Sequence, residues 1–230
     1  MLITDNPLRL VIFDVDGTLI DSQDFILAAM RGAFAHADQP APTDEATLGI
    51  VGLSLPQAME VLVPGISETD RDRLVQFYKD SFVALRQAGG GEAETPFYPG
   101  ARAALDRLDR AGYLLSIATG KARRGLDHML DSHGMRQLFV GTQTADDAPS
   151  KPHPGMVLNC LAATGVARQH AVVVGDTEID MAMARAAGAR AVGVDWGYHS
   201  IERLLRGGAE HIVSDFVQLD AVLLDIWATA

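Results

Sequence analysis

The chain has 230 residues, 48% of them hydrophobic and 21% charged, a composition typical of a globular protein with a sizeable core. The formal net charge of −11 disfavours nucleic acid and anionic lipid as partners, so an anionic substrate would need a metal ion or local positive charge. No apolar run approaches the roughly 18 residues of a membrane span, and the first residues do not resemble a secretory signal. We therefore expect a cytoplasmic monomer or homodimer that contacts neither membrane nor nucleic acid.

The first predicted strand covers residues 9–14 and ends in two acids, Asp14 and Asp16, followed by Gly17 and Thr18. Residues two apart on a strand point to the same side, so the two carboxylates are expected to lie close together. Their repulsion is unfavourable unless a cation compensates it. The end of this strand is therefore a candidate cation site.

Nearly a hundred residues separate this strand from the second one, where a single crossover helix would suffice, which indicates an insertion. Helical patterns begin after Ser22, near Thr43, near Ser54 and at Ser67. The insertion ends in AGGGEAETP, whose glycines suit either a loop or a hinge. We predict an all-helical cap over residues 22–93 and an α/β core over 1–21 and 94–230.

Further short apolar runs at 113–118, 138–142, 171–175 and 191–194 alternate with amphipathic segments of helical length. This alternation is typical of an α/β fold with a doubly wound (Rossmann-like) parallel sheet. Gly112, Gly134, Gly165 and Gly188 follow helical patterns and are predicted to end them in the left-handed conformation.

Ligand sites in such sheets form beyond the carboxyl ends of the strands. The second strand is followed by Thr119, Gly120 and Lys121. The strand at 171–175 is followed by Asp176, with Asp180 four residues later. Lys151 stands in the segment APSKPHP. If DTEID opens a helix, Asp176 and Asp180 share one face of it. Several carboxylates with one lysine favour a hard divalent cation, Mg²⁺ by preference, and the scattered histidines do not suggest zinc.

These residue types support phosphoryl transfer. A carboxylate beside Mg²⁺ can attack a phosphorus atom whose oxygens the metal and a lysine neutralise, and a second acid can protonate the leaving oxygen. Asp14 and Asp16 supply both acids.

The segment DVDGT, Thr119, Lys151 and the segment GDTEID resemble the four motifs of the haloacid dehalogenase superfamily, and the helical insertion is similar to its phosphoglycolate phosphatase-like branch. The resemblance implies an Mg²⁺-dependent phosphatase acting on a small phosphorylated metabolite through an aspartyl phosphate. It implies that Asp14 is the nucleophile and Asp16 the acid/base, that Asp14, Asp16 and Asp176 bind the metal, and that Asp180 supports it indirectly. Thr119, Gly120 and Lys151 would bind the phosphoryl group.

Gly120 departs from the branch, which commonly has asparagine there, and Lys121 could be a solvated lysine or a substrate ligand. We interpret His153 as a turn residue, Cys160 as a buried apolar residue, and Trp196 as either packing or part of the site rim. The predicted cap loop LGIVGLSLPQ contains no Arg or Lys, which favours a small monophosphate over a bisphosphate. A sugar phosphomutase and a non-enzymatic signalling module phosphorylated on aspartate remain alternatives, whereas a dehalogenase would lack an acid at position 16.

Overall fold

The computed structural model describes residues 7–88 and 95–228. Its centre is a sheet of six parallel strands in the order β3-β2-β1-β4-β5-β6. The strands are β1 (Leu10–Phe13), β2 (Leu114–Ala118), β3 (Gly141–Gln143), β4 (Ala171–Gly175), β5 (Arg190–Val194) and β6 (His211–Val213). The four residues of β1 and all of β4 are buried, as expected for strands covered on both faces. The doubly wound α/β fold predicted from the sequence is confirmed.

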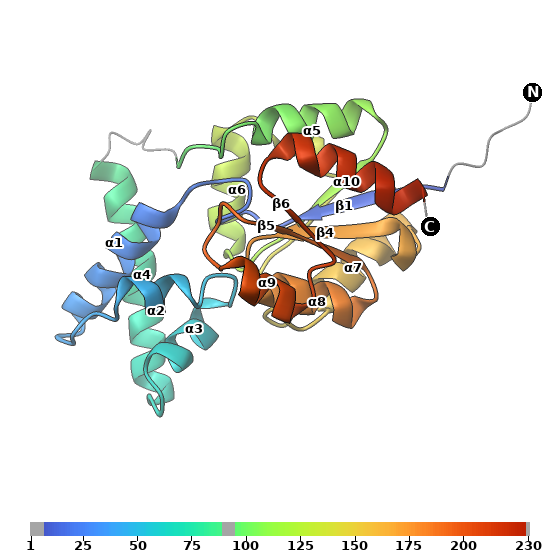
Figure 1. Cartoon of the computed structure of the whole chain (residues 1–230). Coiled ribbons are helices and arrows are strands. Elements are labelled where there is room, and N and C mark those ends of the chain that lie inside the picture. The colour runs from blue at the N-terminus through green and yellow to red at the C-terminus, as the bar shows by residue number, and fades with distance from the viewer. Residues whose placement is uncertain (1–6, 89–94, 229–230) are drawn as a thin grey trace, which may run out of the picture.

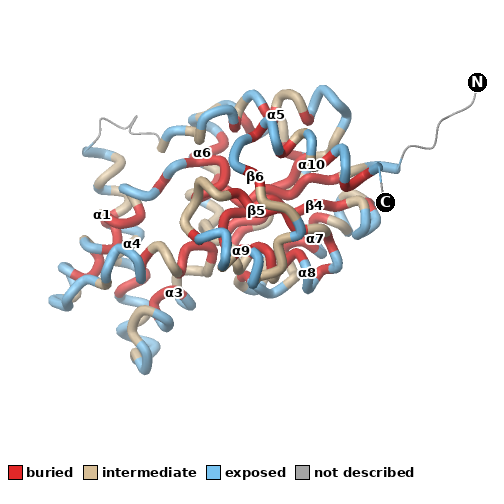
Figure 2. The backbone as a smooth tube through the Cα atoms, viewed as in Figure 1, coloured by how far each residue is buried: buried red, intermediate tan, exposed pale blue. Residues whose placement is uncertain are grey.

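Helices cover both faces of this sheet (Figure 1). One face carries α5 (Ala101–Arg110), α6 (Arg123–Ser132) and α10 (Phe216–Ala228), and the other carries α7 (Gly155–Thr164), α8 (Glu178–Ala187) and α9 (Ile201–Gly207). Each face has its own apolar cluster, and buried residues concentrate in the strands and on the inner sides of the helices (Figure 2). Short 3-10 helices at Arg136–Leu138 and Arg168–His170 lead into β3 and β4.

Four helices inserted between β1 and β2 lie together beside the carboxyl end of the sheet (Figure 1). They are α1 (Gln23–His36), α2 (Asp44–Leu48), α3 (Leu55–Leu62) and α4 (Glu68–Ala88). A separate apolar cluster that includes Met30, Phe34, Met59 and Leu74 joins α1, α3 and α4. The division into a core and a cap at residues 22–93 stays a prediction, because its second boundary and most of the glycine-rich AGGGEAETP lie in 89–94, outside the described residues.

The helix-end predictions are largely confirmed. Gly112, Gly134, Gly165 and Gly188 all have positive φ. Thr43 caps α2 by accepting from the amide of Ala46, and Ser67 accepts from the amide of Asp70. Ser22 precedes α1 as expected but makes no side-chain cap, since its hydroxyl donates to Asp16 instead.

Two strands differ from the sequence prediction. β3 begins at Gly141, so the apolar residues of 138–140 lie before the strand rather than in it. β6 was not predicted, because His211–Val213 is too short to show an alternating pattern. No helix in the described part of the chain combines the length and apolar character needed to cross a membrane.

Candidate active site

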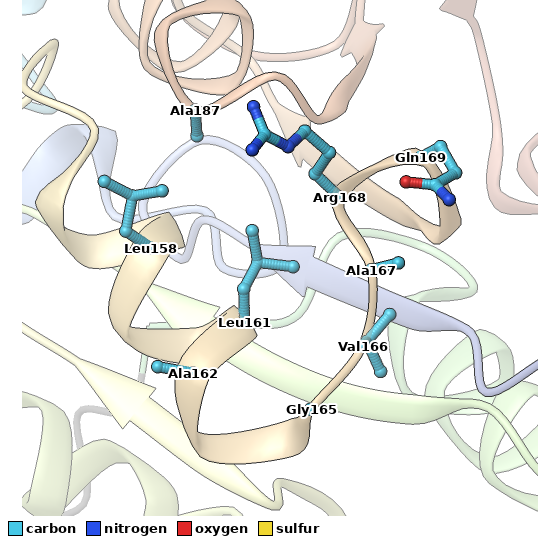
Figure 3. A pocket seen from close by; sticks show the side chains of 9 residues that line it. All are labelled: Leu158, Leu161, Ala162, Gly165, Val166, Ala167, Arg168, Gln169 and Ala187. Atoms are coloured by element: carbon cyan, nitrogen blue, oxygen red, sulfur yellow. The ribbon is translucent and has the colours of Figure 1, made fainter.

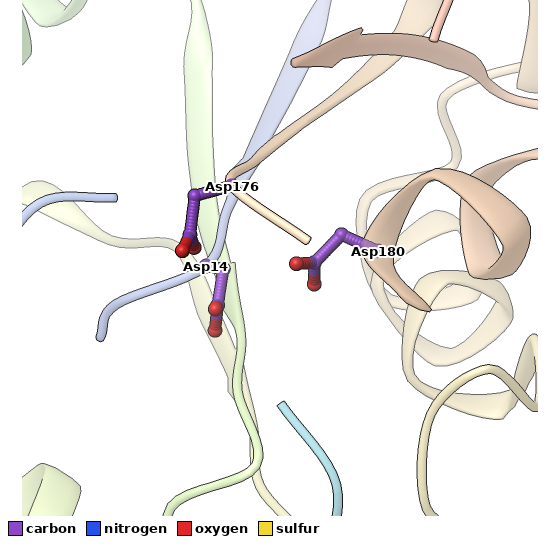
Figure 4. Close-up of side chains that lie close together, drawn as sticks. All are labelled: Asp14, Asp176 and Asp180. Atoms are coloured by element: carbon purple, nitrogen blue, oxygen red, sulfur yellow. The ribbon is translucent and has the colours of Figure 1, made fainter. Parts of the chain in front are cut away.

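Three buried carboxylates meet where β1 and β4 end. Asp14 directly follows β1 and Asp176 directly follows β4, and these strands are neighbours in the sheet, with Phe13 opposite Val174. Asp180 projects toward them from α8 (Figure 4). One oxygen from each carboxylate lies within 4.8 Å of the others, and each residue is at most 2% exposed. The strand order therefore brings together acids that are more than 160 positions apart.

Lys151 supplies the positive charge inside this group. Its Nζ lies 2.8 Å from Oδ1 of Asp14 and 2.7 Å from Oδ1 of Asp180, and its side chain is fully buried. Burial alone would lower the pKa of Lys151, but the charges of Asp14 and Asp180 outweigh it and hold that pKa above its ordinary value. The lysine is therefore permanently charged and fixed between two carboxylates.

Asp180 is held by the start of α8. Its Oδ2 accepts from the amide and hydroxyl of Thr177, and the Thr177 hydroxyl accepts from the Asp180 amide, which completes a reciprocal cap. The expectation that Asp176 and Asp180 share a helix face is wrong, because Asp176 lies before the helix begins. They meet because the β4–α8 turn folds Asp176 back toward the first turn of the helix.

Burial, with repulsion between the acids, changes the ionisation of this group. Burial raises the pKa of Asp14 to about 7, because Lys151 only partly offsets it while Asp180 and Asp16 raise it further. Burial and the charges of Asp14 and Asp180 also raise the pKa of Asp176, against bonds from the Tyr198 amide and the Thr18 hydroxyl. The protein alone does not neutralise this group.

A divalent cation would supply the positive charge that this group of acids lacks. Three carboxylates face one ammonium, and the buried Oδ2 of Asp14 has no hydrogen-bond donor among the described residues. Carboxylate oxygens are the ligands that Mg²⁺ prefers, and the ion retains several waters. Asp14 and Asp176 are the side chains best placed to hold it, since Asp180 already accepts from Lys151 and Thr177.

Asp16 lies beyond the end of β1, at Phe13, and forms an isolated bridge with Ile20. Its carboxylate is not one of the three that converge. Its Oδ1 instead accepts from the Ser22 hydroxyl at 2.5 Å and from Lys121 Nζ at 2.7 Å. Lys121 is thus the ion-pair partner of Asp16 rather than a solvated lysine, and its role as a substrate ligand stays a prediction.

Thr119 and Gly120 follow β2 beside β1, as predicted. Thr119 is buried, and its hydroxyl accepts from the amide of Lys121. A Cβ built on Gly120 would lie 2.7 Å from the carbonyl oxygen of Gly52 and 2.8 Å from that of Leu53. Glycine at this motif position lets the loop between α2 and α3 approach the core.

A cavity of about 450 Å³ lies between the helical group and the sheet edge, and Asp14 opens onto it. Asp14, Asp16, Thr119, Gly120 and Lys121 line it from the core, and residues of the predicted cap loop line it from the other side. The same loop is tied to the core where the Ser54 amide donates to Ser150. The loop therefore faces the site, as its position in the sequence suggested.

The predicted cap loop has no positive charge, but other segments bring positive charge to the cavity. Lys79 and Arg86 of α4 and Arg124 of α6 line the same cavity. Sequence analysis missed them because only the fold brings α4 and α6 to one cavity. A charged residue on a solvated helix face looks the same in a sequence whether or not a cavity opens beside it.

The remaining candidates have structural roles. Trp196 donates its indole N–H to the carbonyl of Thr18 and packs against Tyr98 and Phe216, and it does not line the cavity. His153 accepts from the amide of Gly155 in the turn before α7. Cys160 is buried in the apolar cluster under α7.

A second pocket, of about 460 Å³, lies between the end of α7 and the segment that leads into β4 (Figure 3). Leu158, Leu161 and Arg168 are among its lining residues, and it contains no carboxylate. It is at the amino end of β4, whereas the acids are at the carboxyl end. It is therefore separate from the candidate site.

Comparison with known proteins agrees with this geometry. The haloacid dehalogenase-like hydrolase family matches residues 11–194. A probable phosphatase, IndB, of Dickeya dadantii is 32% identical over 212 residues, 91% of each chain, and a phosphoglycolate phosphatase of Pasteurella multocida is 25% identical over 220 residues, 94% of this chain and 98% of that one. A hydrolase of known structure from Pseudomonas syringae superimposes with a TM-score of 0.84 at 26% identity, covering 95% of this chain and 99% of the other. With its four motifs gathered at one sheet edge, this chain belongs to the haloacid dehalogenase-like hydrolase family.

Proposed function

We propose that this protein is a Mg²⁺-dependent phosphatase that hydrolyses a small phosphate monoester through a phosphorylated Asp14. The observation that supports it most is the environment of Asp14. This carboxylate is buried beside one ammonium and two further acids, its Oδ2 lacks a donor, and it opens onto a cavity. A purely structural aspartate gains nothing from such a position, whereas a nucleophile needs an uncommitted oxygen that faces the substrate.

In the proposed reaction, an oxygen of Asp14 attacks phosphorus and the ester oxygen leaves. Asp16 gives its proton to that leaving oxygen, and later takes a proton from the water that hydrolyses the acyl phosphate. Lys151, with its fixed charge next to Asp14, stabilises the negative charge on the phosphoryl oxygens. The Thr119 hydroxyl and the Gly120 amide would bind the same oxygens.

Asp14, Asp176 and the backbone carbonyl of Asp16 would hold Mg²⁺, which when bound supplies positive charge that neutralises the phosphoryl group. Asp180 acts by fixing Lys151. The helical group above the cavity would exclude bulk water from the acyl phosphate. We further propose a cytoplasmic monomer or homodimer that acts on a phosphorylated metabolite and not on nucleic acid or membrane.

The direct test is phosphate release from a panel of monoesters, with Mg²⁺ or with EDTA. We expect release only with Mg²⁺, and loss of at least about a thousandfold in Asp14→Asn, since removing a nucleophile costs rate on that scale. Asp109→Asn, an exposed acid of α5, is the matched control. Full activity of Asp14→Asn would exclude the assignment of the nucleophile.

A sugar phosphomutase is the second candidate, and the cations of α4 and α6 favour it because a mutase must bind a second phosphate. Mutase activity converts one sugar phosphate into its isomer without net phosphate release. The same panel, followed by phosphorus NMR, separates the two activities. A phosphorylated Asp14 that persists for hours without turnover would instead indicate the signalling module.

A further inference from the structure

Phe82 of α4 contacts the lysine that holds Asp16. The centre of its ring is 5.6 Å from Nζ of Lys121, within the range in which the negative face of an aromatic ring attracts a cation. Lys121 in turn donates to Oδ1 of Asp16 at 2.7 Å. Phe82 belongs to the helical group, whereas Lys121 and Asp16 belong to the turns after β2 and β1. A side chain of the helical group is therefore linked, through one lysine, to the acid assigned to proton transfer.

Two other aromatic rings set the direction of the Phe82 ring. The ring centre of Phe25 of α1 lies 5.8 Å from that of Phe82, and the ring centre of Tyr78, one turn earlier on α4, lies 6.1 Å from it. These distances are typical of aromatic pairs that attract each other. The guanidinium of Arg86 also lies over the Phe82 ring, at 5.5 Å. The packing of α1 against α4 thus decides where the ring offers a face to a cation.

The contact with Asp16 alone does not fix the ammonium of Lys121. A lysine ammonium is carried by a flexible four-carbon stem and can donate three hydrogen bonds. Asp80 and Asp146 line the same cavity and offer it other carboxylates. The side chains of Lys121 and Asp16 are only 16% and 12% exposed, and a cation–π contact is strongest away from water. The Phe82 ring therefore favours the position from which Lys121 reaches Asp16.

We propose that Phe82 is a positioning residue for the acid: its ring holds the ammonium of Lys121 on Asp16 and so keeps that carboxyl aimed at the leaving oxygen. Lys121 and Ser22 both donate to Oδ1, which leaves Oδ2 to carry the proton. In the step concerned, the O–H bond of Asp16 and the ester P–O bond break, and a new O–H bond forms on the leaving oxygen. This inference rests on the proposed phosphatase function and assigns part of its acid catalysis to the helical group.

The test compares two esters that differ in their need for a proton. Benzyl phosphate must expel an alkoxide and needs the acid, whereas p-nitrophenyl phosphate expels a stable phenolate and does not. In Phe82→Leu we expect kcat/KM for benzyl phosphate to fall by about tenfold more than kcat/KM for p-nitrophenyl phosphate, a factor that a shielded cation–π contact can supply. A loss of packing alone would lower both values by the same factor.

Two further changes at position 82 isolate the face of the ring. Phe82→Tyr keeps an aromatic face and should retain the wild-type ratio of the two esters. Stepwise fluorination of the Phe82 ring withdraws electrons from its face with little change in shape, so the ratio should fall with each added fluorine. A ratio that stays at the wild-type value in Phe82→Leu, or in every fluorinated protein, would overturn the proposal.

Phe77→Leu is the matched control. Phe77 lies on the same helix and carries a contact of the same kind, since the guanidinium of Arg73 is 5.8 Å from the centre of its ring. It is not among the residues that line the cavity. The ratio of the two esters should therefore stay at the wild-type value in this variant.

NMR of the lysine side chains separates this proposal from the proposed function. The chain has three lysines, Lys79, Lys121 and Lys151, so lysine labelled with carbon-13 at Cε gives three signals that single variants can assign. The ring current of Phe82 should shift the Lys121 signal, and Phe82→Leu should remove this shift and make the side chain more mobile on the picosecond-to-nanosecond timescale. If no ester is hydrolysed but the Lys121 signal depends on Phe82, the phosphatase function fails and the placement of Lys121 stands. If esters are hydrolysed and the Lys121 signal is the same in both proteins, the positioning role fails alone.

Discussion

Lys121 donates to the carboxylate of Asp16 at 2.7 Å, with both side chains largely shielded from solvent. This contact joins the turn after β1 to the turn after β2, and it orients the acid assigned to proton transfer. In Lys121→Met we expect kcat to fall by about tenfold or more, because a charge-assisted hydrogen bond that positions a reacting group is lost. Steady-state kinetics measure this, and Arg110→Met, at an exposed position of α5 outside the cavity, should keep kcat. An unchanged kcat in Lys121→Met would show that Asp16 needs no such partner.

The metal-free protein should lose stability relative to Asp14→Asn as pH rises. The folded-state pKa of Asp14, about 7, is above the unfolded value of about 3.9. The contribution of Asp14 to the free energy of unfolding is therefore fully present below about pH 4 and is lost as pH rises toward 7. Urea denaturation in EDTA measures the free energy of unfolding at pH 5 and at pH 8. Between these two pH values, that free energy should rise for Asp14→Asn relative to the wild type by a few kcal/mol. The opposite trend would mean that Asp14 is stabilised as a carboxylate without metal.

Replacing Lys151 should destabilise the fold because its buried ammonium pairs with two buried carboxylates. Lys151→Met keeps much of the volume but leaves Asp14 and Asp180 without their cation, and breaking a buried ion pair costs about 3–5 kcal/mol. Chemical denaturation at pH 8 measures the loss, which should shrink at pH 5, where Asp14, whose pKa burial raises to about 7, is protonated. Lys79→Met, on an exposed position, should change the free energy of unfolding by less than about 0.5 kcal/mol.

The effect of Asp176→Asn on stability should depend on whether Mg²⁺ is present. Without metal it removes one charge from a crowded group, so the variant should be at least as stable as the wild type. With Mg²⁺ at about 100 times its dissociation constant, the wild type should gain about 2.7 kcal/mol, or about 5–10 °C in Tm, and the variant much less. Thermal scans with Mg²⁺ and with EDTA check this, and equal shifts in both proteins would remove Asp176 from the metal site.

Gly120→Ala should impair substrate binding by displacing the cap loop. The new Cβ would meet the carbonyl oxygens of Gly52 and Leu53, which are backbone atoms and cannot rotate away. We expect kcat/KM to fall by at least about tenfold, because small displacements of a positioned site have effects of that size or larger. Gly125→Ala in α6 is the matched control, since its Cβ meets nothing within 4 Å, and it should raise stability by about 0.5–1 kcal/mol. Similar kinetics in the two variants would contradict the loop contact.

The acid cluster could be predicted because it depends on residue type and strand order. Asp14 and Asp176 each stand directly after an apolar strand, and a doubly wound parallel sheet brings such positions to one edge. Lys151 could be found only through its motif, since nothing in its own segment shows that it enters the core. The separation of Asp16 from the other acids depends on where β1 ends, and strand ends are the least certain part of such a prediction.

Contacts between the helical group and the core could not be predicted in the same way. Arg86 and Arg124 belong to α4 and α6, which α5 and β2 separate in the chain, and no local pattern relates their positions. The close approach of Gly120 to Gly52 likewise depends on how two segments pack. Periodicity indicates which face of a helix is apolar, but it does not tell which other segment that face will meet.

β1 pairs with β2 on one side and with β4 on the other. During synthesis, β4 cannot pair with β1 until residue 175 has left the ribosome. Until then one edge of Leu10–Phe13 is unpaired, and such an edge can associate with other chains. The pairing that protects this edge is also the one that brings Asp14 next to Asp176. The nascent chain thus brings Asp14 and Asp176 together only at the step that covers this edge of β1.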